Sequence, residues 1–209
     1  MGNREDLLAG AKRCLYEKGY ARTTARDIAA ASGVSLAAIG YHFRSKEALL
    51  NAALIEAIGE WGDELERALT TDVEPVAGSI ERFEAIWTRV IESFATHRTL
   101  WAASFESFGE IDRVPEVRQV LADAMQQGRL GLAQLFQNID SADDEQTAWA
   151  VGSFYHALMT GVLAQWLTDP KRAPSGRDLT NALRMIVADA RPSGEIDTVG
   201  GSGSMAAPG

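Results

Sequence analysis

Apolar residues recur along this chain at the three- and four-residue intervals of an α-helix. Near the start, Leu7, Leu8, Ala11 and Leu15 share one helical face, and the pattern stops at Gly19. No segment shows the strict alternation of a half-buried strand. The sequence therefore predicts an all-α protein of about nine helices, over residues 3–19, 24–33, 36–43, 45–69, 79–96, 99–109, 115–137, 141–167 and 177–190.

The second and third predicted helices form a unit over residues 24–43. Thr24 and Ser35 can each cap a helix, because a hydroxyl accepts one of the backbone N–H groups left free at a helix N-terminus. Gly33 can adopt the left-handed turn that ends the first helix. Two short helices joined in this way make a helix-turn-helix unit, whose second helix fits the DNA major groove. The alternative is an ordinary helical hairpin inside an all-helical domain.

Charge is distributed unevenly along the chain. Residues 1–50 carry eight Lys or Arg and five Asp or Glu, a net charge of +3, whereas the remaining 159 residues carry a net charge of −12. Binding to phosphates needs a local positive patch and does not need a protein that is basic overall. This distribution favours DNA binding by the helix-turn-helix unit over the plain hairpin.

Other features of the sequence indicate the cellular compartment in which the protein works. No run of about 18 apolar residues could span a membrane, and residues 1–6 lack the apolar segment of a signal peptide. Cys14 is the only cysteine, so no internal disulfide can form, which fits a reducing compartment. We therefore expect a cytoplasmic protein without a membrane partner.

The helix-turn-helix unit and its flanks resemble the TetR family of bacterial transcriptional repressors. The resemblance covers roughly the first 55 residues and is carried by Thr24, Ile28-Ala29, Ser32-Gly33-Val34-Ser35, Ile39, Tyr41-His42-Phe43 and Ser45-Lys46-Glu47-Ala48-Leu49. It implies an N-terminal three-helix DNA-binding domain followed by a helical ligand-binding and dimerisation domain. We expect the first over residues 1–48, the second over 49–191, and a disordered Gly- and Ser-rich tail over 192–209.

In members of this family, the cap of the second helix, the exposed face of the third and the start of the fourth contact DNA. Carried over by position, the DNA-binding residues are Thr24, Ser35, Leu36, Ala37, Ala38, Tyr41, His42 and Lys46. Hydroxyl groups can donate to phosphate and a lysine adds positive charge. The leucine and alanines can read only DNA shape or a thymine methyl group, so specificity should also depend on Arg26, on shape and on water. For His42, a structural hydrogen bond within the unit is the alternative.

The third helix departs from the family pattern at two places. Ala37 and Ala38 stand where a small residue followed by Thr or Ser is common, and Gly40 replaces the first residue of an aromatic pair. Gly40 removes one possible DNA contact and loosens a short helix. Two roles for it remain open: it lets the backbone approach the DNA closely, or the helix becomes ordered only on binding.

The helices predicted over 141–167 and 177–190 are candidates for an interface between two copies of the chain. The first is apolar on two faces, so it should be covered on two sides. Packing against the same pair of helices from a second subunit would make a four-helix bundle across a twofold axis. A homodimer would also present two recognition helices to a palindromic operator. The alternative is a central helix in a monomeric core.

Aromatic residues concentrate beyond residue 50, where all five tryptophans lie. Core packing accounts for most of them, but aromatic walls with a few polar groups also describe a small-molecule cavity. Ring faces and carboxylates would suit a lipophilic cation as effector. The candidate effector-binding residues are Phe83, Trp87, Trp101, Phe105, Glu106, Met125, Phe136, Trp149 and His156.

Sequence motifs of catalysis are missing. The three histidines, His42, His97 and His156, are far apart and lack acids at metal-ligand spacing, and no phosphate loop or nucleophile elbow occurs. We predict no enzyme activity, cofactor or metal, and a repressor released from operator DNA by a small, largely apolar effector. The alternatives are an architectural DNA-binding protein without an effector and, remotely, a helical enzyme.

Overall fold

The computed structural model describes residues 2–70, 79–112 and 115–189. These residues form nine α-helices and no strand, which confirms the predicted fold class. The predicted tail over 192–209 and nearly all of the loop that follows residue 70 lie outside the described residues. The helices are α1 (Asn3–Lys18), α2 (Ala25–Ser32), α3 (Leu36–Phe43), α4 (Lys46–Thr70), α5 (Ile80–Thr96), α6 (Arg98–Phe108), α7 (Pro115–Gln137), α8 (Glu145–Thr168) and α9 (Gly176–Asp189).

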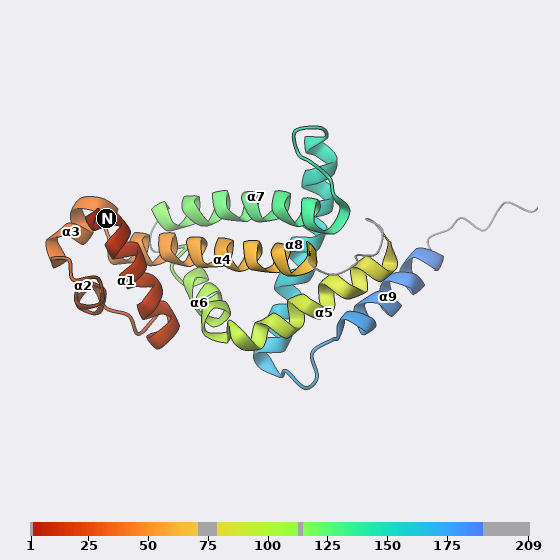
Figure 1. Cartoon of the computed structure of the whole chain (residues 1–209), viewed down its shortest axis with the longest axis horizontal. Helices are drawn as coiled ribbons and strands as arrows, with labels where there is room; N and C mark the ends of the chain where they lie inside the picture. Colours follow the sequence, from red (N-terminus) through yellow and green to blue (C-terminus); the bar gives the residue numbers. More distant parts are fainter. Residues whose placement is uncertain (1, 71–78, 113–114, 190–209) are drawn as a thin grey trace, which may run out of the picture.

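The molecule is elongated, with α1, α2 and α3 gathered at one end (Figure 1). Helix α4 leaves this end and runs along the middle of the molecule beside α7, and α8 crosses them. Helices α5 and α9 lie together towards the opposite end. None of the described helices is both long enough and apolar enough to cross a membrane.

The end made by α1 to α3 has its own hydrophobic core. Leu7 and Leu15 of α1, Ile28 of α2 and Ile39 of α3 are almost completely buried in it. Gly10 of α1 lets α2 approach closely, because a Cβ atom there would lie 2.8 Å from Cβ of Ser32. The predicted apolar stripe of the first helix is therefore the face that holds the other two helices in place.

A second core, rich in aromatic rings, fills the opposite part of the molecule. Phe136 of α7 stacks on Tyr155 of α8 with ring centroids 4.1 Å apart, and Phe83 and Trp87 of α5 pack around them. Helices α7 and α8 cross closely at Gly152, where a Cβ atom would overlap the carbonyl oxygen of Arg129. Helix α4 joins the two cores, since Leu50 lies in the first and Trp61 in the second.

Helix α8 begins later than predicted. The sequence predicts a start at residues 141–143, but these residues form a turn and the helix starts at Glu145. The Asp144 carboxylate accepts a hydrogen bond from the backbone N–H of Thr147 and so caps the helix. Asp140 instead accepts a hydrogen bond from the N–H of Ala142 and stabilises the turn. Several acidic residues could have been the cap, and local sequence did not distinguish them.

Candidate nucleic-acid interface and ligand cavity

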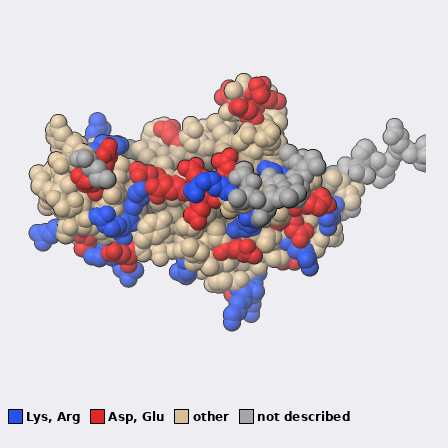
Figure 2. Space-filling model, in the orientation of Figure 1, with Lys and Arg blue, Asp and Glu red and all other residues tan. Residues whose placement is uncertain are grey.

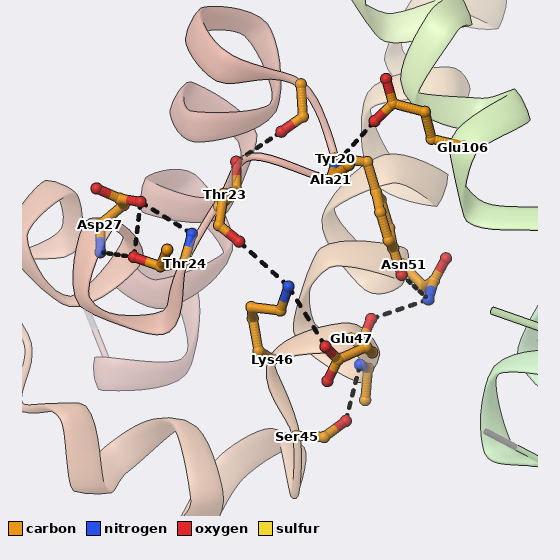
Figure 3. Close-up of polar contacts among 12 residues, drawn as sticks. Tyr20, Ala21, Thr23, Thr24, Asp27, Ser45, Lys46, Glu47, Asn51 and Glu106 are labelled. Atoms are coloured by element: carbon orange, nitrogen blue, oxygen red, sulfur yellow. Dashed lines mark hydrogen bonds and ion pairs between the residues drawn. The ribbon is translucent and has the colours of Figure 1, made fainter. Parts of the chain in front are cut away.

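Helix α2 begins with two reciprocal hydrogen-bonding residues (Figure 3). The hydroxyl of Thr24 accepts from the backbone N–H of Asp27 at 3.2 Å, and the Asp27 carboxylate accepts from the N–H and the hydroxyl of Thr24. Lys18 of α1 pairs with the same carboxylate at 2.6 Å. Together, Lys18 and Thr24 hold the pKa of Asp27 well below its usual range. The start of α2 is therefore fixed to α1.

The turn between α2 and α3 follows the predicted geometry. Gly33 has a φ of +69°, the left-handed conformation that glycine adopts without strain. Ser35 stands at the N-cap position of α3, but its hydroxyl makes no capping bond and is exposed. This hydroxyl is therefore available to a partner outside the protein.

Helix α3 presents one face to solvent and one to the core. Ile39 and Phe43 are buried, as predicted for the core of the unit. The exposed face contains Leu36, whose exposed fraction is 49 %, and Tyr41, whose exposed fraction is 86 %. Of the other predicted contacts, Ala37 is exposed, whereas Ala38 and His42 are partly buried on the flanks of this face.

Cationic side chains lie around the helix-turn-helix unit, but they differ in freedom. Lys46 is partly buried: its ammonium group donates to the carbonyl oxygen of Thr23 at 3.2 Å and pairs with Glu47 at 3.3 Å (Figure 3). Arg26 and Arg44 are exposed, and their side chains make no hydrogen bond or ion pair with the described residues. In Figure 2, Lys and Arg side chains lie over this end of the molecule beside a few Asp and Glu, both signs occur along the middle, and Asp and Glu gather at the upper tip.

A cavity of about 520 Å³ lies between α4, α6, α7 and α8. Its wall is mostly apolar and contains four of the predicted effector-binding residues, Trp101, Phe105, Met125 and His156. The described lining includes the carboxylates of Asp63 and Glu66 on α4 but no Lys or Arg. The full lining is Leu54, Ile55, Ile58, Gly59, Trp61, Gly62, Asp63, Leu65, Glu66, Trp101, Ser104, Phe105, Ser107, Phe108, Leu121, Ala124, Met125, Gln127, Gly128, Gly131, Leu132, Gln134, Leu135, His156, Met159, Thr160 and Leu163.

The other predicted effector-binding residues lie elsewhere. Phe83, Trp87 and Phe136 belong to the packed aromatic core on the α5 side of α7 and α8. Trp149 lies near the start of α8 and is half exposed. Glu106 reaches from α6 to the loop between α1 and α2. Helical periodicity shows which residues lie on the same face of one helix. Which of these faces borders a cavity depends on how the helices cross.

Sequence reasoning also missed the contribution of α4 to the cavity. Gly59 and Gly62 of α4 line it, as do Gly128 and Gly131 of α7. At residues 59, 62 and 131, apart from chain neighbours and the backbone of the same helix, no atom lies within 4 Å of the place where a Cβ atom would stand. The sequence therefore does contain a signal for this cavity: two long helices each carry a pair of glycines three residues apart, which leaves space between the two helices.

His156 is the titratable group on the α8 side of the cavity. Burial lowers the pKa of its imidazole, and the nearby positive charge of Arg129 lowers it further. Its side chain lies beside α7, since a Cβ atom at Gly128 would stand 3.7 Å from Cδ2 of His156. The ring is therefore neutral at pH 7 and can take part in a hydrogen bond without adding positive charge to the cavity.

Helix α6 connects the cavity to the helix-turn-helix unit. Its Leu100 and Ala103 are buried in the first core, whereas Trp101 is buried in the second. One helical turn further on, the Glu106 carboxylate accepts a hydrogen bond of 2.8 Å from the backbone N–H of Ala21 (Figure 3). A movement of α6 would therefore also displace the loop that leads into α2.

Two family models match most of the chain. The model described as "Bacterial regulatory proteins, tetR family" matches residues 7–53. The model described as "Tetracyclin repressor-like, C-terminal domain" matches residues 78–189. The two matches cover the helix-turn-helix end and the cavity-bearing part, respectively.

Individual proteins agree with the family models. The chain is 27% identical over 176 residues to the HTH-type transcriptional regulator TtgR of Pseudomonas putida, covering 80% of this chain and 81% of that protein. It is 47% identical over 49 residues to the HTH-type transcriptional repressor Rv1474c of Mycobacterium tuberculosis, covering 23% and 26% of the two chains.

Solved structures share the fold. The multidrug binding protein EbrR complexed with proflavin aligns with a TM-score of 0.60 at 21% identity, covering 88% of this chain and 99% of that chain. A putative transcriptional regulator from Saccharomonospora viridis in complex with choline aligns with a TM-score of 0.55 at 24% identity, covering 90% and 96%.

Proposed function

This chain belongs to the TetR family of bacterial regulatory proteins, and from that premise we propose that it is a dimeric repressor released from a palindromic operator by a small, largely apolar ligand. At the level of the family it is a DNA-binding transcriptional regulator with a C-terminal ligand-binding domain, and such regulators are not enzymes. The operator symmetry, the release and the chemistry of the ligand are the proposed parts.

The observation that carries the proposal is the position of α4 and α6. Both helices line the cavity, and both are also packed into the core that holds the helix-turn-helix unit. If the ligand and the DNA prefer different arrangements of these helices, bound ligand lowers the affinity of the protein for DNA. Bound DNA lowers the affinity of the protein for the ligand by the same factor. Couplings of this kind are typically about 1–3 kcal/mol, which corresponds to roughly 5- to 150-fold in affinity.

The charge of the cavity favours a lipophilic cation as the ligand. Asp63 and Glu66 are the charged side chains of its described lining, and the aromatic faces of Trp61, Trp101 and Phe105 can also attract positive charge. Two solved structures with this fold are complexes with proflavin and with choline. Those ligands support the same class here.

We propose that the dimer forms through α8 and α9. From residue 146 to 168, α8 contains no Asp, Glu, Lys or Arg, and Phe154, Ala157 and Gly161 lie on its exposed side. Helix α9 packs on α5 and leaves Met185 and Ile186 exposed. Apolar surface of this kind is typical of an interface between copies of one chain. A twofold axis through it would present the two α3 helices to two half-sites.

The test combines selected DNA with a pair of matched ligand probes. Sequences that the protein binds are first selected from random duplexes. Binding to the selected duplex is then measured with tetraphenylphosphonium, a lipophilic cation that does not intercalate, and with tetraphenylborate, its anionic counterpart of similar shape. We expect a palindromic sequence, and release by the cation at concentrations where the anion has no effect. DNA binding that neither probe changes would contradict the proposed effector class. Failure to select any sequence from the random duplexes would contradict the proposed function.

A further inference from the structure

The recognition helix offers very few groups that can read base edges by hydrogen bonding. From residue 36 to 43, α3 reads Leu-Ala-Ala-Ile-Gly-Tyr-His-Phe and contains no Arg, Lys, Asn, Gln, Asp or Glu. These are the side chains that usually pair with the donors and acceptors of the major groove. Ser35, Tyr41 and His42 remain as polar groups, and His42 is partly buried.

What α3 presents instead is an exposed apolar surface at its N-terminal end. Leu36 is half exposed, and Ala37 beside it is exposed. Gly40 follows one turn later on the same side of the helix and is also exposed. At Gly40, apart from its chain neighbours and the backbone of its own helix, no atom lies within 4 Å of the place where a Cβ atom would stand, so packing within the protein does not require a glycine there.

The surroundings of this surface indicate which partner covers it. Arg26 and Arg44 lie on either side of it along the chain, exposed and without side-chain partners among the described residues. Exposed guanidinium groups bind phosphates, and the hydroxyl of Ser35 is free to do so as well. An apolar surface flanked in sequence by exposed groups that bind phosphates fits the major groove, where the only apolar group on a base edge is the C5 methyl of thymine.

We infer that Leu36 and Ala37 recognise the operator by packing against thymine methyl groups in each half-site, and that Gly40 lets the backbone of α3 lie closer to the DNA than a side chain would allow. This inference rests on the proposed function. It assigns the chemistry of sequence reading to apolar contacts, with hydrogen bonds serving mainly to position the protein on the phosphates.

The test on the DNA side removes methyl groups one at a time. The duplex selected from random sequences is remade with deoxyuridine in place of each thymine, because deoxyuridine keeps every hydrogen-bonding group and lacks only the methyl. We expect one or two positions in each half-site where this change weakens binding about fourfold, the value of one buried methyl group. Replacing the equivalent position in both half-sites should weaken binding about fifteenfold. Thymines outside the half-sites serve as controls and should tolerate the change.

The test on the protein side uses Leu36→Ala. In a double-mutant cycle, Leu36→Ala should weaken binding to the thymine duplex and make it insensitive to deoxyuridine at the contacted position. Val120→Ala, which shortens a partly exposed side chain on α7, is the matched control and should leave the full sensitivity to deoxyuridine.

Gly40→Ala separates folding from DNA contact. Since the position is open within the protein, alanine should fit and should raise the melting temperature, because alanine favours helix more than glycine. Binding to the selected duplex should nevertheless fall at least tenfold, because the added methyl group would stand between helix and DNA.

Two results would overturn the inference. If every deoxyuridine duplex binds as tightly as the thymine duplex, α3 does not read methyl groups, although a selected palindrome would leave the proposed function standing. If Gly40→Ala binds DNA as well as the unchanged protein does, the close approach of the backbone is wrong. Failure to select any sequence would instead remove the proposed function and this inference together.

Discussion

Lys46 has three N–H donors, and contacts inside the protein account for part of this capacity. The ammonium group donates to the carbonyl oxygen of Thr23 and pairs with Glu47, so it holds the start of α4 against the entry to α2. Its remaining capacity can serve a DNA phosphate. The sequence could predict a phosphate contact for this lysine but not its second, structural role.

Lys46→Ala should weaken binding to all duplexes alike and reduce the slope of log affinity against log salt by about one. Titrations of the selected duplex at several salt concentrations would measure the slope, and thermal melting would confirm that the variant is folded. Lys171→Ala is the control, because it removes the same charge from an exposed position between α8 and α9. An unchanged slope in folded Lys46→Ala would count against the phosphate contact.

His156 should make the stability of the protein depend on pH. Burial lowers the pKa of its imidazole in the folded state, so as the pH falls below the ordinary value of about 6.5 the unfolded state takes up the proton first. The free energy of unfolding should therefore decrease between pH 7 and pH 5. In His156→Gln this decrease should be smaller, as followed by denaturant unfolding at each pH. Identical pH profiles for the two proteins would show that the ring is not protected from protonation.

The same residue should affect the ligand. Protonation of His156 would place a positive charge in the wall of the cavity, which opposes binding of a cation. The affinity for tetraphenylphosphonium, measured by calorimetry, should fall as the pH is lowered through the depressed pKa of this ring, and His156→Gln should weaken this dependence. Binding that tightens as the ring takes up its proton would contradict a cationic ligand next to it.

At the scale of helices, local signals in the sequence were sufficient for the element order and for the helix-turn-helix unit. Caps and turns depend on residues close in sequence, as with Thr24 and Asp27 or the left-handed Gly33, so they could be recognised without the fold. Contacts between distant segments could not. Glu106 binds Ala21 across 85 residues of sequence, and nothing local to residue 106 distinguishes this role from that of a charge in a cavity.

The aromatic residues show the same limit. Phe83, Trp87 and Trp101 all lie on the apolar faces of their helices, yet only Trp101 lines the cavity. The crossing of α7 over α8 at Gly152 determines which faces are sealed and which border open space. The periodicity of a single helix contains no information about this crossing.

Glu106 should carry part of the ligand response. Glu106→Ala removes the acceptor for the N–H of Ala21, whereas Glu106→Gln keeps an oxygen that can accept the same bond. We expect the alanine variant to bind tetraphenylphosphonium normally but to release DNA by a smaller factor than the unchanged protein does. The glutamine variant should respond almost as the unchanged protein. If the alanine and glutamine variants release DNA equally, the hydrogen bond does not contribute to coupling.

For the whole molecule, the proposed dimer would determine how many recognition helices meet the DNA. Phe154→Asp or Ile186→Asp places a charge on the exposed apolar surface of α8 or α9, and burying an unpaired charge in an interface is costly. Each variant should sediment as a monomer and bind the selected palindrome at least 100-fold more weakly. Val120→Asp on α7 is the control and should remain a dimer. If both Phe154→Asp and Ile186→Asp remain dimers, the interface must lie elsewhere on the molecule.

In the proposed repressor, two copies of this chain place two α3 helices on one palindromic duplex. The most direct measurement is sedimentation of the selected duplex with increasing protein, in the presence of mixed competitor DNA. We expect a complex of two protomers per duplex, with half-sites about one helical turn apart, that dissociates on addition of tetraphenylphosphonium. A single protomer on the DNA, or equal binding to the competitor, would contradict it.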